Sequence, residues 1–176
     1  MENITIRKIQ KEDIPAVIDI QIRGWQTAYK GIIDDSYLAA MNREERIQKR
    51  EQDYLDSSFI VAESAGNIVG FCRYIDTNTY TPEVENADCE LMAIYVDPDL
   101  KRKGIGKNLF EYATADFLKK NKKKMVLWCL KDNTPSKIFY KKMGGRMIKE
   151  RPIKINQKNY AEVCFAYDIQ QHSSKP

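Results

Sequence analysis

Histidine is almost absent from this sequence, and its absence limits the available chemistry. The single histidine, His172, lies in the polar C-terminal stretch QQHSSKP. Many enzymes that activate a serine or cysteine nucleophile use a histidine base. With no histidine in the body of the chain, we expect any general base to be a carboxylate, a tyrosine, a lysine or water.

Paired cysteines are also missing. The chain has four widely spaced cysteines without a CxxC pair, each inside an apolar stretch: Cys72, Cys89, Cys129 and Cys164. A structural zinc site needs clustered cysteine or histidine ligands. We therefore predict no metal site and four reduced cysteines buried in the core.

Long apolar runs are absent as well. The N-terminal stretch MENITIRKIQKEDIP lacks the apolar segment of a signal peptide, and no run approaches membrane-spanning length. The chain has 176 residues, 43% hydrophobic and 31% charged, which is the composition of a globular protein. We predict a cytoplasmic protein with no membrane partner, one domain over residues 1–169 and a polar tail over residues 170–176.

Charge is divided unevenly along the chain. Residues 1–98 hold 10 Lys and Arg against 18 Asp and Glu, a net charge of −8, whereas residues 99–176 hold 19 against 7, a net charge of +12. The first part therefore favours cations and the second favours anions. The stretch KKNKKK (119–124) could bind nucleic acid, but no aromatic residues alternate with it for base stacking. A solvated, lysine-rich helix end explains it better, so we predict no nucleic-acid partner.

Apolar spacing and capping residues predict the helices. The first follows Asp13, a typical N-cap residue, with Pro15 in its first turn, and breaks at Gly31. A second helical stretch is expected at about residues 35–54, interrupted at Asn42. Two more follow: an amphipathic helix marked by Leu109, Phe110, Ala113 and Phe117, and a short helix with Thr134 as N-cap and Pro135 at its first position.

Runs of β-branched and aromatic residues predict the strands. They cover residues 4–9, 59–64, 68–76, 88–96, 125–130, 145–151 and 160–169, with a hairpin turn through Gly66 and Asn67. Residues 77–87 are expected to form a polar loop. The order β-α-α-β-β-β-α-β-α-β-β indicates an α/β domain (α+β, with a mixed sheet) without repeats or a long linker.

Two glycines one residue apart, Gly104 and Gly106, separate the strand at 88–96 from the next helix, among lysines and an arginine. Glycines at a helix N-terminus let backbone N–H groups approach a phosphate closely. The Walker pattern GxxxxGK[ST] is excluded, because Asn108 follows Lys107 and Lys101 holds the first glycine position. The dinucleotide pattern GxGxxG fits poorly, because Leu109 replaces its last glycine. An ordinary tight turn is the alternative when this motif is taken alone.

The run KRKGIG, entered from a strand ending YVDP, resembles the [QR]xxGxG/A pyrophosphate loop of the GNAT superfamily of acyl-CoA N-acetyltransferases. The later stretch NTPSKIFYKKMGG (133–145) resembles the second motif of that family, N-x-x-[AS]-x-x-[FL]-Y-x-x-x-G-F, at Asn133, Ser136, Phe139, Tyr140 and Gly144. Two positions depart from these motifs: Lys101 replaces Gln or Arg, and Gly145 replaces an aromatic residue. The resemblance covers essentially the whole chain. The stretch GWQTAYKGIIDDSYL (24–38) is similar to a bacterial subgroup, some of whose members acetylate polyamines.

The resemblance implies a GNAT-like fold, in which the parallel strands at 88–96 and 125–130 splay apart around acetyl-CoA, the cosubstrate. Its pantetheine arm would pair with the backbone of Ile94, Tyr95 and Val96, and Asn133 would hydrogen-bond to it. Its pyrophosphate would bind where N–H groups, the helix dipole and cations favour negative charge. The residues implied there are Arg102, Lys103, Gly104, Ile105, Gly106 and Lys107, and Tyr140 would face the sulfur.

Acetyl transfer to an amine needs one group that removes a proton and one that supplies a proton. The motif match makes Tyr140 the acid, with a packing role as the alternative. Glu90 is the candidate base, directly or through a water, because a carboxylate in an apolar strand is unfavourable unless it is paired or functional. The alternative for Glu90 is a structural pairing with an arginine. A strand N–H near Ile94 would meet the oxyanion.

We therefore predict an N-acetyltransferase that moves an acetyl group from acetyl-CoA to a primary amine; a CoA-binding regulatory module without turnover is the alternative. The acidic N-terminal part favours a polyamine or another small cationic amine, unless that part is only solvated surface. Asp34, Asp35 and Glu90 would lie nearest this acceptor, with Trp25 and Tyr29 as walls. The sequence leaves monomer and homodimer open.

Overall fold

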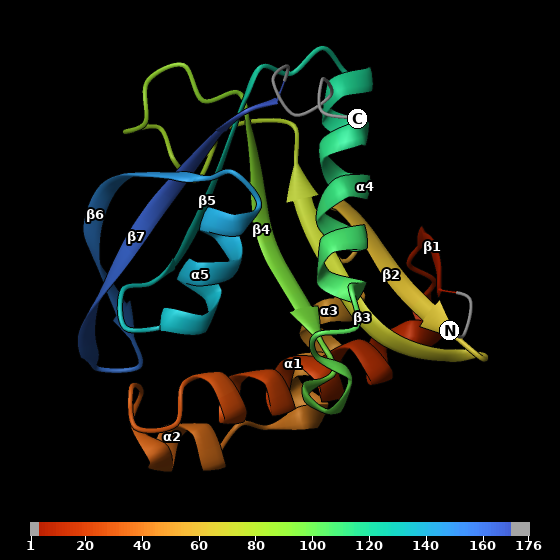
Figure 1. The fold of residues 1–176 in the computed structure, drawn as a ribbon. Helices are drawn as coiled ribbons and strands as arrows, with labels where there is room; N and C mark the ends of the chain where they lie inside the picture. Colours follow the sequence, from red (N-terminus) through yellow and green to blue (C-terminus); the bar gives the residue numbers. More distant parts are fainter. Residues whose placement is uncertain (1–3, 170–176) are drawn as a thin grey trace. The chain divides into compact units, whose positions relative to one another are not determined.

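The computed structural model describes residues 4–169, so the expectations for His172 and the tail lie outside the described residues (Figure 1). Seven strands form a mixed sheet in the order β1-β2-β3-β4-β5-β7-β6, which confirms the predicted α/β fold class. The chain divides into two compact units, residues 1–74 with 93–113 and residues 75–92 with 114–176. Strand β4 (Cys89–Val96) and helix α4 (Ile105–Lys119) each contribute residues to both units. Within residues 4–169, no helix is long and apolar enough to cross a membrane.

Three antiparallel strands lie side by side in the first unit (Figure 1): β1 (Ile4–Lys8), β2 (Ser58–Ser64) and β3 (Asn67–Ile75). The hairpin between β2 and β3 turns through Ala65 and Gly66, whose φ angles are 48° and 76°. Two consecutive positive φ angles match the twist of the flanking strands. The predicted turn lies in the stretch AGN (65–67), which contains the observed turn, but the junction predicted at Gly66 and Asn67 is one residue too late. Asn67 begins β3, and its side chain donates to the Ala65 carbonyl at 3.1 Å.

The first unit also holds α1 (Ile14–Ala28), α2 (Asp35–Ala39) and α3 (Arg43–Asp53). The predicted interruption at Asn42 is confirmed: its side chain caps α3 by accepting from the Glu45 N–H at 3.1 Å. Asp13 precedes α1 as predicted, but its carboxylate binds Arg7 at 2.7 Å and does not cap the helix. One face of α1 buries Val17 and Ile20 in a cluster with Phe59, Val61 and Phe71 of the neighbouring strands.

The second unit holds the start of β4, then β5 (Lys124–Leu130), α5 (Thr134–Lys142), β6 (Arg146–Ile155) and β7 (Lys158–Asp168). Strands β4 and β5 are parallel, with Cys89 opposite Met125 and Glu90 opposite Val126. Strand β7 lies antiparallel to β5 on one side and to β6 on the other. The parallel neighbours predicted at 88–96 and 125–130 are therefore confirmed.

The hairpin of β6 and β7 is longer than predicted. The predicted strands leave out residues 152–159, yet β6 continues to Ile155 and β7 begins at Lys158. Asn156, with a φ of 56°, begins the two-residue turn. Pro152 weakens the sequence signal, but β6 is the edge strand of the sheet, where a residue without an N–H is tolerated.

Side chains of the second unit alternate between two faces of the sheet. Val126, Cys164 and Ala166 form a buried cluster on one face, covered by Val84 and Ala87 of the loop between β3 and β4. Phe165, between Cys164 and Ala166 in the sequence, points to the other face, where its ring contacts Tyr140 of α5. All four cysteines are free and buried, as predicted. Burial raises the pKa of the Cys129 and Cys164 thiols to about 12, which keeps them unreactive.

Candidate active site

The turn after β4 presents an exposed, cationic backbone. Asp97 caps the short helix Pro98–Leu100 by accepting from the Asp99 N–H at 3.0 Å. Residues 101–104 (Lys, Arg, Lys, Gly) then run exposed to the start of α4. Arg102 has a φ of 66°, which is unusual for a residue with a side chain and marks a held conformation.

Gly104 is the glycine that this turn requires. Its φ is +84°, and a Cβ built there would meet nothing within 4 Å. The space above this backbone is therefore open, and α4 begins at the next residue with the N–H groups of its first turn. This arrangement fits a pyrophosphate. Gly106 differs, because it is the second residue of α4 and not part of the left-handed turn.

The last turns of α1 hold the end of β4 in place. Arg23 forms ion pairs with Asp97, at 3.0 Å, and with Asp99. The next residue, Gly24, leaves room for the Tyr95 ring, since a Cβ there would lie 3.0 Å from the Tyr95 Cδ1 atom. The Trp25 indole then donates to the Tyr95 hydroxyl at 2.8 Å. Three consecutive residues thus fix the strand that was predicted to pair with pantetheine.

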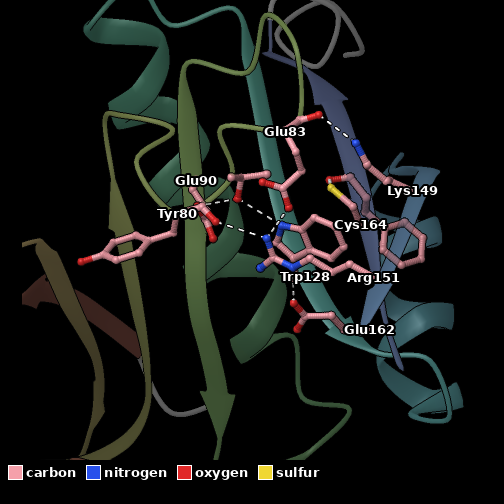
Figure 2. A network of polar contacts seen from close by, with 10 residues as sticks. Tyr80, Glu83, Glu90, Trp128, Lys149, Arg151, Glu162 and Cys164 are labelled. Atoms are coloured by element: carbon pink, nitrogen blue, oxygen red, sulfur yellow. Dashed lines mark hydrogen bonds and ion pairs between the residues drawn. The ribbon is translucent and has the colours of Figure 1, made fainter. Parts of the chain in front are cut away.

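Glu90 lies in a buried polar network of the second unit (Figure 2). Only 7% of its surface is exposed, and its Oε2 accepts from the Thr81 hydroxyl at 2.9 Å. The same hydroxyl oxygen accepts from the Trp128 indole N–H at 3.1 Å. The carboxylate therefore points to the face of the sheet that carries Trp128 and Cys164 (Figure 2).

Arg151 of β6 organises the other charges of this network (Figure 2). Its guanidinium binds Glu162 at 2.6 Å, Glu83 and the Tyr80 carbonyl, and lies 3.9 Å from the centre of the Trp128 ring. Glu90 is thus not the ion-pair partner of this arginine, which was the structural alternative. Arg151 instead ties the loop between β3 and β4 to β6 and β7.

Burial raises the pKa of the Glu90 carboxyl above its usual value. The hydrogen bond from Thr81 and the charge of Arg151 oppose this shift, whereas the charges of Glu162 and Glu83 add to it. A raised pKa brings a carboxyl group closer to neutral pH, where it is a more effective general base.

The lysine-rich stretch at 119–124 holds the same loop. Lys120 lies 3.2 Å from the Asp116 carboxylate and 3.5 Å from that of Asp76. Lys122 donates to the Asp76 carbonyl at 2.6 Å, and Lys124 to the Glu85 carbonyl at 3.4 Å. These lysines form part of the fold and not only a solvated helix end.

Tyr140 of α5 is buried on the other face of the sheet, with its ring against Phe165. Its carbonyl accepts from the Tyr167 hydroxyl and from the Gly145 N–H, each at 3.0 Å. A Cβ on Gly145 would lie 2.6 Å from the Tyr167 Cζ and hydroxyl oxygen. Tyr167 of β7 therefore occupies the space beside Gly145, where the family motif has an aromatic residue.

Asn133 is buried and is the N-cap of α5, accepting from the Ser136 N–H at 3.2 Å. The prediction of Thr134 as N-cap is wrong by one residue, since Thr134 is the first residue of the helix. The cap uses the carbonyl of the Asn133 side chain and leaves its amide group as a donor for a ligand.

The four residues expected near the acceptor in the first unit have structural partners. Arg46 lies 5.8 Å from the centre of the Trp25 ring, and Tyr29 packs edge-on against that ring at 5.1 Å. Asp34 caps α2 by accepting from the Ser36 N–H at 2.9 Å, and Asp35 accepts from the Gly31 N–H at 3.3 Å. A packing role therefore explains Trp25 and Tyr29, and capping or turn stabilisation explains the two aspartates.

The predicted residues thus fall into two groups. The strand end Ile94–Val96 and the turn at 101–107 belong to the first unit, and Glu90, Asn133 and Tyr140 belong to the second. Sequence reasoning missed Arg23, Thr81, Arg151, Glu162 and Tyr167. Arg23 lies 74 residues from Asp97, and Tyr167 lies 27 residues from Tyr140. No local pattern reports such pairings.

Comparisons with known proteins bear on these features. A sequence model of the acetyltransferase (GNAT) family matches residues 21–145. The uncharacterized N-acetyltransferase YuaI of Bacillus subtilis is 28% identical over 164 residues, which cover 93% of this chain and 92% of that protein. A spermidine N(1)-acetyltransferase of Thermoplasma acidophilum is 27% identical over 152 residues, which cover 82% of this chain and 89% of that protein.

Solved structures give the same picture. The crystal structure of the PaiA N-acetyltransferase of Thermoplasma acidophilum, in complex with coenzyme A, has a TM-score of 0.69 and 26% identity, covering 91% of this chain and 98% of that one. An N-acetyltransferase from Staphylococcus aureus Mu50 has a TM-score of 0.70 over 95% of this chain and 99% of that one. Its identity is 19%, so this second likeness concerns the fold.

Proposed function

The chain belongs to the acetyltransferase (GNAT) family, and we propose that it transfers the acetyl group of acetyl-CoA to a primary amine of a small cationic acceptor. The family match and the likeness to N-acetyltransferases make it an acetyl-CoA-dependent N-acetyltransferase. The acceptor class and the roles of individual residues are the proposed part.

One observation carries the assignment of roles. Glu90 and Tyr140 lie on opposite faces of the sheet in the second unit, Glu90 with Val126 and Trp128, and Tyr140 with Phe165. A group that removes a proton from the amine and a group that protonates the departing sulfur need to act on different atoms.

Each residue then has one task. Acetyl-CoA supplies an acetyl thioester, whose thiolate is already a competent leaving group, so that alignment provides much of the catalysis. Glu90, directly or through a water, takes the proton that the ammonium of the acceptor must lose. As the amine nitrogen bonds to the acetyl carbon, it loses its second proton to solvent, the C–S bond breaks, and the Tyr140 hydroxyl gives its proton to the sulfur. Exchange with solvent restores Glu90 and Tyr140.

Binding of the cosubstrate is assigned to the residues around the turn. Arg102, Lys103, Lys107 and the N–H groups from Gly104 to Gly106 would hold the pyrophosphate. The strand backbone at Ile94–Val96 and the free amide group of Asn133 would hold the pantetheine arm.

A cationic acceptor is supported by charge. Glu83 and Glu162 bind Arg151, and Glu90 lies in the same network, so that three carboxylates face the two cations Arg151 and Lys149 and leave an excess of negative charge there. Residues 1–98 carry a net charge of −8. A 27%-identical relative is a spermidine N(1)-acetyltransferase. Asp34 and Asp35 are not needed for this proposal, because the Asp34 carboxylate caps α2 and the Asp35 carboxylate stabilises the preceding turn at Gly31.

The test is release of free CoA thiol with a panel of amines. We expect kcat/KM for spermidine to exceed that for a neutral or acidic amino acid, and the advantage to shrink at high salt as the carboxylates are screened. Equal kcat/KM values, or a preference for the acidic amine, would contradict the proposal of a cationic acceptor. Calorimetric binding of acetyl-CoA without thiol release from any amine would instead favour the regulatory module.

A further inference from the structure

Thr81 is a buried polar residue with no role in the mechanism above. It lies in the loop between β3 and β4, and none of its surface is exposed. Its hydroxyl oxygen is 2.9 Å from the Glu90 Oε2 and 3.1 Å from the Trp128 Nε1. The hydroxyl therefore stands between an indole on β5 and the candidate base on β4.

The chemistry of these groups fixes the direction of both hydrogen bonds. An indole N–H can only donate, so Thr81 accepts from Trp128. A threonine hydroxyl has one hydrogen, and within residues 4–169 its other recorded partner is Glu90. The hydrogen of Thr81 is thus directed at Glu90, and an ionised carboxylate accepts it most strongly.

The charged groups that face Glu90 do not replace this bond. Arg151 and Lys149 come from β6, but Arg151 binds Glu83 and Glu162, and Lys149 donates to the Glu83 carbonyl at 2.9 Å. Glu83 from the loop and Glu162 from β7 are negative, and the Cys164 thiol is buried. Within the described residues, Thr81 is the hydrogen-bond donor recorded for Glu90.

We propose that Thr81 is a positioning residue, which Trp128 orients so that its hydroxyl holds Glu90 in the ionised form that accepts the substrate proton. The proposal rests on the proposed function, because it assumes that Glu90 is the base. It explains why the fully buried hydroxyl of a loop residue bonds to both an indole nitrogen and a carboxylate.

The first experiment measures kcat/KM against pH. In Thr81→Val, which keeps the shape but removes the hydroxyl, the acid limb should move up by about one pH unit, since a hydrogen bond to a charged group is lost. Thr81→Ser keeps the hydroxyl and should restore the wild-type profile. Trp128→Phe keeps the Thr81 hydroxyl but removes the indole N–H that orients it, so we expect the acid limb to move up by a smaller amount. An acid limb that stays in place in both Thr81→Val and Trp128→Phe would overturn the proposal.

A second readout needs no substrate. The chain has two tryptophans, so Trp25→Phe leaves Trp128 as the only indole. Its fluorescence should titrate with Glu90, and the midpoint should rise when Thr81→Val is added. Glu90→Gln should abolish the transition. If Thr81→Val does not fold, Thr81→Ala serves in its place.

The two readouts separate the two proposals. A fluorescence midpoint that moves without acetyl transfer to any amine supports the link between Thr81 and Glu90 and rejects the proposed function. Active enzyme with an unmoved midpoint and an unmoved acid limb keeps the proposed function and rejects the role of Thr81.

Discussion

Asp13 and Glu90 are both buried carboxylates, and their surroundings act on them in opposite directions. Hydrogen bonds from the Arg7 guanidinium lower the pKa of Asp13 below its usual value. Burial raises the pKa of Glu90, and its hydrogen-bond donor is a neutral hydroxyl. The ion pair with Arg7 therefore favours the ionised form of Asp13, as expected for a structural residue, whereas burial disfavours the ionised form of Glu90. Such a shift is typical of functional carboxylates.

Glu90→Gln should make the protein more stable relative to wild type as pH rises. The pKa of Glu90 is raised in the folded state, so the folded protein binds this proton more tightly than the unfolded chain does. The resulting stabilisation is fully present below the unfolded pKa of about 4.5, and it is lost as pH rises through the folded pKa. Glutamine does not ionise and avoids this loss. Urea unfolding at pH 4 and pH 8 measures the difference in free energy of unfolding between the variant and wild type.

Asp13→Asn is the control of opposite sign: its loss of stability relative to wild type should be largest near pH 7 and should shrink as pH falls below 4. A constant difference for Glu90→Gln would contradict the burial argument.

Tyr140→Phe should lower kcat by about tenfold or more while leaving the Kd for CoA nearly unchanged, because it removes the proposed proton donor and none of the groups proposed to bind CoA. The ring packing against Phe165 is kept in this variant. Single-turnover kinetics and calorimetric titration with CoA check both parts. Unchanged kcat at saturating acetyl-CoA would reduce Tyr140 to a packing residue.

At the scale of helices and strands, three glycines have different structural roles. Gly104 adopts a φ of +84° in open space, whereas Gly24 and Gly70 make room for Tyr95. A Cβ on Gly70 would lie 2.9 Å from the Tyr95 carbonyl oxygen. Glycine on β3 and glycine on α1 therefore allow close packing around one residue of β4. The turn glycine serves conformation and access, and the other two serve packing.

Gly104→Ala should weaken acetyl-CoA binding by more than its effect on stability explains. The left-handed conformation costs a side-chain residue about 1 kcal/mol, and the new methyl group enters the space above the turn. Gly66→Ala is the matched control, because Gly66 has a φ of +76° and equally open surroundings in the β2–β3 hairpin. Both variants should lose similar Tm, and only Gly104→Ala should lose affinity for CoA by calorimetry. Equal affinities would remove the turn from the cofactor site.

The sequence predicts most elements of this fold and fails where tertiary contacts decide. Apolar spacing and the interruption at Asn42 predict the helices, and the two motifs locate the turn and α5. The long β6–β7 hairpin is missed because Pro152 interrupts the strand signal; at the edge of the sheet the proline is tolerated, and pairing with β7 continues the strand. Glu90 stands out as a carboxylate in an apolar strand, but Thr81 and Arg151 do not, because their roles arise from contacts that only folding creates.

Over the whole molecule, the cationic residues fall into two groups: those that bind other groups of the fold and those that stay exposed. Lysines of the 119–124 stretch form ion pairs with Asp76 and Asp116 and donate hydrogen bonds to backbone carbonyls of the loop before β4. The cations of the turn at 101–103 are exposed, and among residues 4–169 they form no such ion pairs. The net charge of +12 over residues 99–176 thus includes both structural lysines and cations available to an anion.

Acetyl-CoA affinity should fall as salt rises, because cations that neutralise phosphates are screened. Arg102→Glu should weaken binding and reduce this salt dependence. Lys107→Glu should have a smaller effect, because Lys107 already lies 3.6 Å from Glu111. Lys49→Glu, an exposed change of the same charge on α3, is the control and should leave affinity unchanged. Calorimetry at 50 and 500 mM NaCl, concentrations on either side of roughly physiological ionic strength, measures all four proteins; identical salt slopes would contradict the assignment.

Gly145 and Tyr167 also have an evolutionary consequence. Tyr167 fills the space in which a Cβ on Gly145 would stand, so neither position can change freely while the other stays as it is. A lineage that acquires an aromatic residue at position 145 must first, or simultaneously, accept a smaller residue at position 167. Orthologues should therefore divide into two exclusive classes, glycine with a large aromatic or an aromatic with a small residue, and chimaeras that mix the classes should fold poorly.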